Sequence, residues 1–190
     1  TTYVGHPVLE SGADRGDGSA FRKRHKIRNN EQVLLVLFGS RKSEVTRHLS
    51  EFKKTISQLQ TALGDFRVVT LTTPATHDLV ARAIEKSTKQ IIIISDPAQK
   101  SDAFAASNVA LAASGTVALE LAIAMVPSVI AYRMNLFTSW LAKRFVKIRF
   151  ANLVNLTLER EAIPEFLFER CRAEMIVPAI QQLMTSDTAL

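Results

Sequence analysis

The sequence predicts one α/β domain built on a doubly wound parallel sheet. Short, largely apolar runs alternate with amphipathic segments along the chain. The length of 190 residues suits one domain, or one domain and a fragment of another. Apolar residues make up 47% and charged residues 22%, which are ordinary values for a globular protein. Wholly apolar strands are typical of parallel sheets, because helices cover both faces of such a sheet.

Five apolar runs are expected to form the strands. They cover residues 33–38, 66–71, 91–95, 108–113 and 128–131. The first run, VLLVLF, is interrupted by Gly39, and Pro127 separates the last run from the helix expected before it. Each run is short enough for a strand and lies between stretches of different pattern, as a βαβ arrangement requires.

Helices are expected in the intervals. The clearest follows Arg41 and carries one apolar stripe at spacings of three and four, made of Val45, Leu49, Phe52, Ile56, Leu59 and Leu63. Gly64 stands where that helix should stop. Further helices are expected over residues 76–86, 100–106, 115–125, 137–148 and 172–185, with a loop over 150–158.

The beginning of the chain reads as a loop followed by a basic stretch. Residues 10–19 hold Gly12, Gly16 and Gly18 among polar residues, which is typical of a loop or linker. The basic residues that follow are Arg22, Lys23, Arg24, Lys26 and Arg28. A solvated helix face is the ordinary interpretation of this stretch, and a nucleic-acid patch is the alternative.

Charge and cysteine content limit the choice of partner and compartment. The formal net charge is +6, which suits an anionic partner such as a nucleotide, a phosphate, a nucleic acid or a membrane surface. Cys171 is alone, so no intrachain disulfide can form, a reducing compartment is favoured, and a structural role is expected. The chain has no run long enough for a membrane span, no signal peptide and no initiator Met, which suggests an excised domain.

Two turns between a predicted strand and a predicted helix have the character of phosphate sites. They consist of Gly39, Ser40 and Arg41 after the first strand, and of Ser114, Gly115 and Thr116 after the fourth. Each offers N–H groups at a helix start, where the partial positive charge attracts anions. Arg41 adds a fork of donors for two phosphate oxygens. Each serine alone could instead be a helix N-cap, but the pair at neighbouring strand ends is more specific.

Glu120 is the only charged residue of the helix expected over 115–125, which is otherwise apolar on every side. A carboxylate in a buried setting is costly unless it is paired or hydrogen-bonded. It follows Thr116 by four residues, so both lie on one face and the carboxylate leans toward the helix start. We expect it to accept from the hydroxyls of a ribose beside the bound phosphate. The alternative is an internal ion pair with a residue such as Arg133.

Several other chemistries are disfavoured by missing motifs. No G-x-G-x-x-G follows a strand, and no G-x-x-x-x-G-K-[ST] loop occurs, so a dinucleotide cofactor and an ATPase of that class are not expected. The four histidines do not cluster and no Cys/His spacing suggests zinc, so neither a metal nor a cofactor is predicted.

A basic helix with an aromatic face is expected over residues 137–148. Its candidate membrane-surface residues are Phe137, Trp140, Lys143, Arg144 and Lys147. A helix that packs on the sheet and keeps a solvated basic edge is the more ordinary interpretation, because one amphipathic helix does not distinguish a core from a bilayer.

Longer motifs resemble one family over nearly the whole chain. The matching segments are YVGHP from Tyr3, GSRKSEV from Gly39, ASGTVALELA from Ala113 and AYRMNLFTSWLAKRFVK from Ala131, followed by NL at Asn155 and PE at Pro164. Together they resemble the C-terminal half of the lipid-A-disaccharide synthases, which are glycosyltransferases of the B-type fold. The resemblance implies a Rossmann-like domain over residues 21–190 that binds a UDP-sugar donor, with residues 1–20 as the inter-domain linker and loop.

The resemblance also implies an activity for the full-length protein. Diacylglucosamine would pass from its UDP conjugate to diacylglucosamine 1-phosphate with inversion, at the cytoplasmic face of the inner membrane of a Gram-negative bacterium. The two phosphate turns would hold the UDP pyrophosphate, Glu120 the ribose, and Asn155 would line the donor pocket. The acceptor site and the general base would lie in an N-terminal domain that is absent here, so no catalytic residue is assigned and the chain alone is expected to be inactive.

Three positions depart from the family pattern. Phe38 and Val154 stand where the family has proline, and Phe168 stands where it has glutamine. Two other function classes stay open: a basic nucleic-acid-binding module that uses Arg22 to Arg28 and the basic cluster of residues 143–149, and another UDP-sugar transferase or epimerase of related fold. Nucleic acid is not the expected partner, because no aromatic and basic platform for single strands is apparent.

Overall fold

The computed structural model describes residues 7–84, 91–133 and 150–186. Within these ranges, parallel strands form one sheet in the order β3-β2-β1-β4-β5-β6. The strands are β1 (Val33–Leu37), β2 (Arg67–Leu71), β3 (Ile91–Ile94), β4 (Val109–Ala113), β5 (Ser128–Tyr132) and β6 (Glu165–Leu167). The five predicted strands are confirmed. The sixth escaped prediction because it has three residues and opens with a glutamate.

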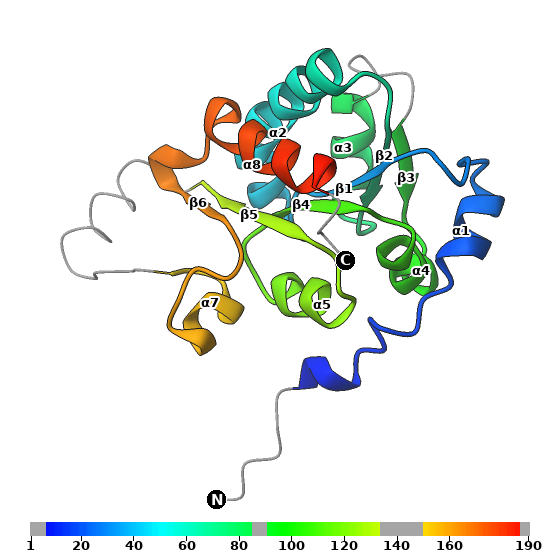
Figure 1. The fold of residues 1–190 in the computed structure, drawn as a ribbon, viewed down its shortest axis with the longest axis horizontal. Helices are drawn as coiled ribbons and strands as arrows, with labels where there is room; N and C mark the ends of the chain where they lie inside the picture. Colours follow the sequence, from blue (N-terminus) through cyan, green and yellow to red (C-terminus); the bar gives the residue numbers. More distant parts are fainter. Residues whose placement is uncertain (1–6, 85–90, 134–149, 187–190) are drawn as a thin grey trace, which may run out of the picture.

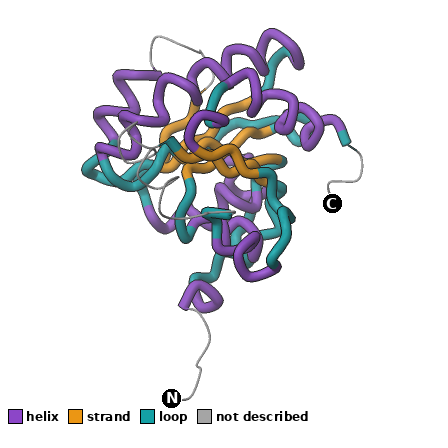
Figure 2. Tube along the Cα trace, turned by 90° about the vertical axis from the view of Figure 1, so that its left-hand side faces the viewer, coloured by secondary structure: helices purple, strands orange, loops and turns teal. Residues whose placement is uncertain are grey.

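Helices lie on both faces of the sheet (Figures 1 and 2). They are α1 (Gly18–Arg24), α2 (Lys42–Leu63), α3 (His77–Ile84), α4 (Lys100–Ala105), α5 (Val117–Ile123), α7 (Leu153–Leu158) and α8 (Ala173–Thr185), with short 3-10 helices η1 (Pro7–Glu10), η2 (Pro97–Gln99) and η3 (Phe168–Arg170). The doubly wound architecture predicted from the strand and helix alternation is therefore confirmed.

The sheet divides the core into two halves. Leu34 and Val36 of β1 pack with α2, α3 and α8 on one face. Leu35 and Leu37 of the same strand pack with α1, α4 and α5 on the other face. Because successive side chains of a strand point to opposite faces, a wholly apolar strand needs a helical layer on each side. This explains why the predicted strands carry no polar alternation.

The long helix α2 follows the predicted apolar stripe. Val45, Phe52, Ile56 and Leu59 are buried, and Leu49 and Leu63 pack against the same core from partly buried positions. Gly64 ends the helix with a φ of 78°, in the left-handed region that glycine adopts without strain.

Two helices differ from the predictions. Helix α5 is shorter than residues 115–125 and is not buried all round, because Met125 is 83% exposed and takes a φ of 56° just beyond the helix. The predicted loop over 150–158 is wrong, because these residues contain α7, which begins after the N-cap Asn152. The predicted helix over residues 137–148, including its membrane-surface candidates, lies outside the described residues.

The segment before β1 packs closely on α4. Ala13 is buried, and a β-carbon on Gly16 would overlap the Ser101 carbonyl. Asp17 caps α1 by accepting from the Ala20 N–H group at 2.8 Å. Helix α1 begins at Gly18, so the expected loop over 10–19 ends two residues early and the predicted boundary at residue 20 falls inside a helix.

Candidate functional site

The two predicted phosphate turns lie side by side at the carboxyl edge of the sheet. Strand β1 pairs with β4 in parallel from Leu34 opposite Val109 to Leu37 opposite Ala112. The turn after β1 and the turn after β4 therefore leave neighbouring strands in the same direction. This edge is where ligands bind in open α/β sheets.

The turn after β4 has backbone donors without partners. Among the described residues, no hydrogen bond is made by the N–H groups of Gly115, Thr116 or Val117. The N-cap position of α5 is Thr116, which makes no side-chain cap bond, so Ser114 is not the N-cap that the alternative interpretation required. The Ser114 hydroxyl instead donates to the Ala151 carbonyl at 3.3 Å. The turn is thus open to an acceptor.

The turn after β1 is occupied by a side chain of its own helix. The Glu44 Oε2 atom accepts from the N–H groups of Ser40 and Arg41 at 3.0 and 3.2 Å. The Arg41 guanidinium donates to Glu44 Oε1 at 3.1 Å while remaining 79% exposed. Ser40 is not the N-cap either, because Arg41 holds that position. A carboxylate therefore already satisfies the N–H groups that were assigned to phosphate.

Gly39 is needed for this arrangement. Its φ is 118°, a region that other residues rarely adopt. A β-carbon at this position would also lie 2.7 Å from Glu44 Cβ. The turn can fold back over Glu44 only because Gly39 has no side chain.

Glu120 is ion-paired, and its partner is Lys100. The Nζ–Oε1 distance is 2.7 Å, and the Glu120 side chain is 16% exposed against 41% for Lys100. The alternative of an internal ion pair is thus seen, with Lys100 at the start of α4 in place of the suggested Arg133. Oε2 of Glu120 has no hydrogen-bond partner among the described residues. The role of Glu120 toward a ribose stays a prediction.

Asn155 is fully buried and its amide is used within the chain. Its Oδ1 atom accepts from the N–H groups of Ala162 and Ile163 at 2.8 and 2.9 Å. Its Nδ2 atom donates to the Ile163 carbonyl at 2.8 Å. These bonds fasten the loop that leads into β6. Contact between Asn155 and a donor molecule stays a prediction, and in this state the side chain has no free edge for it.

A buried histidine joins the ends of β1 and β5 next to the site. His48 Nε2 accepts from the Arg133 N–H group at 3.1 Å, and Nδ1 donates to the Phe38 carbonyl at 3.1 Å. The backbone N–H can only donate, so the ring carries its proton on Nδ1. Burial lowers the pKa of His48. The neutral ring thus fixes the backbone where the chain leaves β5.

Glu51 binds the Arg133 side chain behind that histidine. Its Oε1 atom contacts Arg133 Nη1 and Lys54 Nζ, each at 3.3 Å. Its Oε2 atom accepts from the Ala173 N–H group at 3.2 Å, at the start of α8. Burial alone would raise the pKa of Glu51, but the hydrogen bond from Ala173 and the charges of Lys54 and Arg133 outweigh it, so the pKa is lowered.

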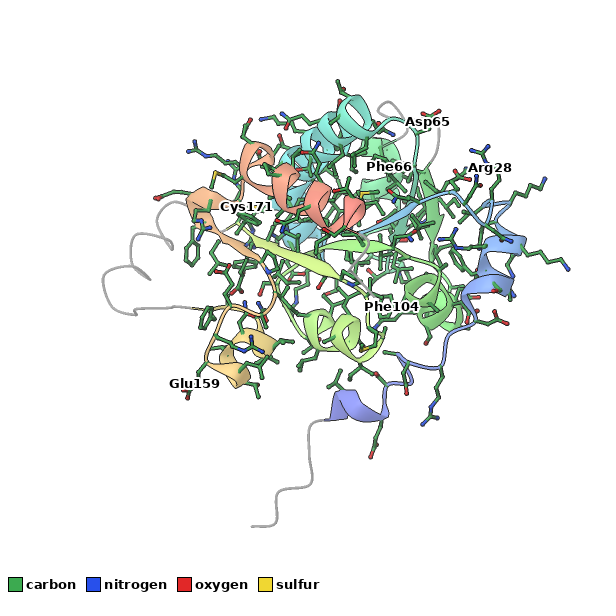
Figure 3. The ribbon with its side chains drawn as sticks, viewed as in Figure 1. Arg28, Asp65, Phe66, Phe104, Glu159 and Cys171 are labelled. Atoms are coloured by element: carbon green, nitrogen blue, oxygen red, sulfur yellow. The ribbon has the colours of Figure 1, made fainter. Side chains whose placement is uncertain are left out.

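Two further predicted residues have structural settings. Arg22 donates to the carbonyls of Arg28, Glu31 and Ala106 and to Asn108 Oδ1, so this member of the basic stretch serves the fold. Cys171, labelled in Figure 3, is buried, and burial raises the pKa of its thiol to about 11. This agrees with the expected structural role. Among the described residues, no group of three or more His, Cys, Asp or Glu could hold a metal ion.

Sequence reasoning missed the two residues that most change the site. Glu44 stands three residues after Arg41, the spacing at which a helix glutamate reaches back to the N-cap N–H, so this contact had a signal. Lys100 had none, because it comes from another helix 20 positions away and nothing local links it to Glu120.

Solved structures of glycosyltransferases share this fold. A glycosyltransferase from Rickettsia africae superposes with a TM-score of 0.62 over 90% of this chain and 43% of its own, at 11% identity. WaaG, a glycosyltransferase involved in lipopolysaccharide biosynthesis, gives 0.61 over 90% of this chain and 42% of its own, at 14% identity. The predicted fold class, a Rossmann-like half of a B-type glycosyltransferase, is confirmed.

Sequence comparisons identify the family. The lipid-A-disaccharide synthase of Rhodospirillum centenum is 47% identical over 99% of this chain and 47% of its own length. That of Paramagnetospirillum magneticum is 41% identical over the whole chain and 49% of its own length. The chain thus spans about half the length of these relatives. The family model described as lipid-A-disaccharide synthetase matches residues 1–188, and the chain belongs to this family.

Proposed function

We propose that this chain is the donor-binding part of a lipid-A-disaccharide synthase and holds the UDP moiety at the carboxyl edge of its sheet. The observation that carries the proposal is the turn after β4, where three unbound N–H groups stand within one helical turn of the Glu120 carboxylate. The names of the relatives support the activity, which we assign to the full-length protein.

The pyrophosphate would lie over residues 115–117. Their N–H groups are free among the described residues, and Gly115 has no neighbour within 4 Å of a β-carbon position. Arg41 of the adjacent turn is mostly exposed, so its guanidinium can turn from Glu44 to a phosphate oxygen. Fixed donors of this kind stabilise a leaving diphosphate without a metal ion.

The ribose would lie on the Glu120 side of the pyrophosphate. Glu120 is one turn into α5, and its free Oε2 atom is a hydrogen-bond acceptor for ribose hydroxyls. In the full reaction, an acceptor hydroxyl would attack the anomeric carbon as the bond to UDP breaks. Its proton would go to a general base that we place, with the acceptor site, in the part of the relatives that this chain does not span.

Membrane contact is a separate part of the proposal. The acylated substrates favour a surface that lies on the inner membrane, and the basic aromatic segment with Phe137, Trp140, Lys143, Arg144 and Lys147 supports it. Within the described ranges, no helix is long and apolar enough to cross a bilayer.

Calorimetric titration of UDP and of pyrophosphate into the 190-residue chain tests the donor site. We expect Glu120→Gln to lower the affinity for UDP about tenfold, which is the cost of one hydrogen bond to a charged group. The affinity for pyrophosphate should fall less than twofold. Asp65→Asn is the control, because Asp65 is exposed and lies between α2 and β2, at the opposite edge of the sheet. No heat at millimolar UDP, or equal losses for both ligands in Glu120→Gln, contradicts the proposal.

A further inference from the structure

Lys100 brings a second helix to the carboxylate of Glu120. It is the first residue of α4, which follows β3 and η2, and its Nζ atom lies 2.7 Å from Glu120 Oε1. Helices α4 and α5 pack against the same half of the core (Figure 1). The contact thus links the segment after β3 to the turn after β4 across one face of the sheet.

The ammonium group of Lys100 lies over an aromatic ring of the same helix. Lys100 Nζ lies 5.7 Å from the centroid of the Phe104 ring, one turn further along α4. Phe104, labelled in Figure 3, is fully buried. A lysine that rests on a fixed ring loses part of its freedom before any ligand arrives, so its direction toward Glu120 is set by the fold.

The ion pair between Lys100 and Glu120 leaves two N–H donors of the ammonium group and one carboxylate oxygen without a described partner. An ammonium group has three N–H donors, and one reaches Glu120 Oε1. Glu120 Oε2 has no partner among the described residues. Two adjacent hydroxyls, each able to donate and to accept, match this set, because one can donate to Oε2 while its neighbour accepts from Nζ. A lone hydroxyl would have to make both contacts with one oxygen, and an ionised phosphate has no proton to donate to Oε2.

We infer that Lys100 is a specificity-determining residue that, with Glu120, reads the 2′,3′-diol of the donor ribose. The inference rests on the proposed donor site. Lys100 fixes one carboxylate oxygen and donates to the ribose, so Glu120 presents its other oxygen in one orientation. The Lys100 side chain is 41% exposed, and ion pairs that water reaches add little to stability, so removing its charge should change ligand choice more than folding.

The test compares UDP, 2′-deoxy-UDP and pyrophosphate as titrants of the 190-residue chain. Wild type should bind UDP about tenfold more tightly than 2′-deoxy-UDP, the worth of one hydrogen bond to a charged group. Lys100→Met keeps the aliphatic stem over Phe104 and removes the charge. This variant should bind UDP less than twofold more tightly than 2′-deoxy-UDP. Its affinity for pyrophosphate should stay within twofold of wild type. Lys100→Arg, which keeps a cationic donor, should retain a ratio above threefold. Lys23→Met removes one exposed charge from α1 and should behave as wild type.

The outcomes separate this inference from the donor site itself. A Lys100→Met variant that keeps the wild-type ratio, or that weakens all three ligands equally with an unchanged urea midpoint, overturns the role of Lys100. If the wild type binds no UDP, or if Glu120→Gln keeps the preference for UDP over 2′-deoxy-UDP, the proposed donor site fails as well. If Lys100→Met and Glu120→Gln both lose the preference for UDP over 2′-deoxy-UDP, the result supports recognition of the ribose diol by the two residues together.

Discussion

Glu51 connects three parts of the fold, and its replacement by glutamine tests whether its charge matters. One oxygen faces the cations of Lys54 and Arg133, and the other accepts from the Ala173 N–H group. Glutamine has the same shape but only one oxygen. Whichever way its amide turns, an NH2 group faces either the two cations or the Ala173 N–H. The substitution therefore cannot satisfy both sides.

The expected loss is about 2 kcal/mol at pH 7, because hydrogen bonds to charged groups contribute about 1.5–3 kcal/mol. We take a middle value because Lys54 and Arg133 are 57% and 47% exposed, so water weakens their share. The Ala173 contact is the better buried one, and it replaces a side-chain cap that the N-cap residue Arg172 does not provide. The loss should appear as a fall in urea midpoint of about 1 M.

Urea unfolding followed by circular dichroism from pH 7 to pH 3.5 checks the sign as well as the size. The pKa of Glu51 is lowered in the folded state, so its contribution is present above the unfolded value of about 4.3 and disappears as the pH falls through the folded value. The difference between wild type and Glu51→Gln should therefore shrink below about pH 4.3. Glu10→Gln should stay within about 0.5 kcal/mol of wild type. A difference that is constant down to pH 3.5, or equal to the control, would refute the reasoning.

Two further predictions concern positions beside the candidate site. Burial lowers the pKa of His48, so the unfolded chain takes up a proton first as the pH falls below about 6.5, and wild type should lose about 1 kcal/mol more than His48→Gln between pH 7.5 and 5.5 in urea unfolding. Parallel pH curves for the two proteins would contradict this. Gly39→Ala should destabilise by about 1–3 kcal/mol because of the φ of 118° and the contact with Glu44, while Gly115→Ala, with open space around it, should change the melting temperature little. Similar effects at the two glycines would show that the conformation of Gly39 carries no strain cost.

The fold was predictable because its elements carry strong local patterns. Runs such as residues 33–38 have no polar residue, and the stripe from Val45 to Leu63 allows one helix face only. Elements with weak patterns were missed or extended. Strand β6 has three residues and begins with Glu165, whose carboxylate accepts from the N–H groups of Ala151 and Asn152, a contact that local pattern cannot reveal. The helix predicted over residues 115–125 is longer than α5, because an apolar sequence does not show that the chain leaves the core at Met125.

The position of the candidate site could be predicted from the sequence, but not which of its hydrogen-bonding groups already have protein partners. Parallel strands bring the turns after β1 and β4 together, so the order of elements was enough to place residues 39–41 beside residues 114–116. Which donors are already used depends on side-chain contacts. Glu44 reaches back within its own helix, and Lys100 reaches across from α4. The second contact joins helices that only the folded sheet makes neighbours.

The two turns therefore play unequal parts in the proposed donor site. Gly115 and Thr116 are exposed and their N–H groups have no described protein partner, so a phosphate there replaces water and breaks no protein hydrogen bond. A phosphate over Ser40 would have to displace the Glu44 carboxylate, which occupies the same donors with the same sign of charge. That exchange of one anion for another gains little. Strand β1 thus contributes chiefly the exposed Arg41 side chain, and the N–H groups that receive the diphosphate belong to the turn after β4.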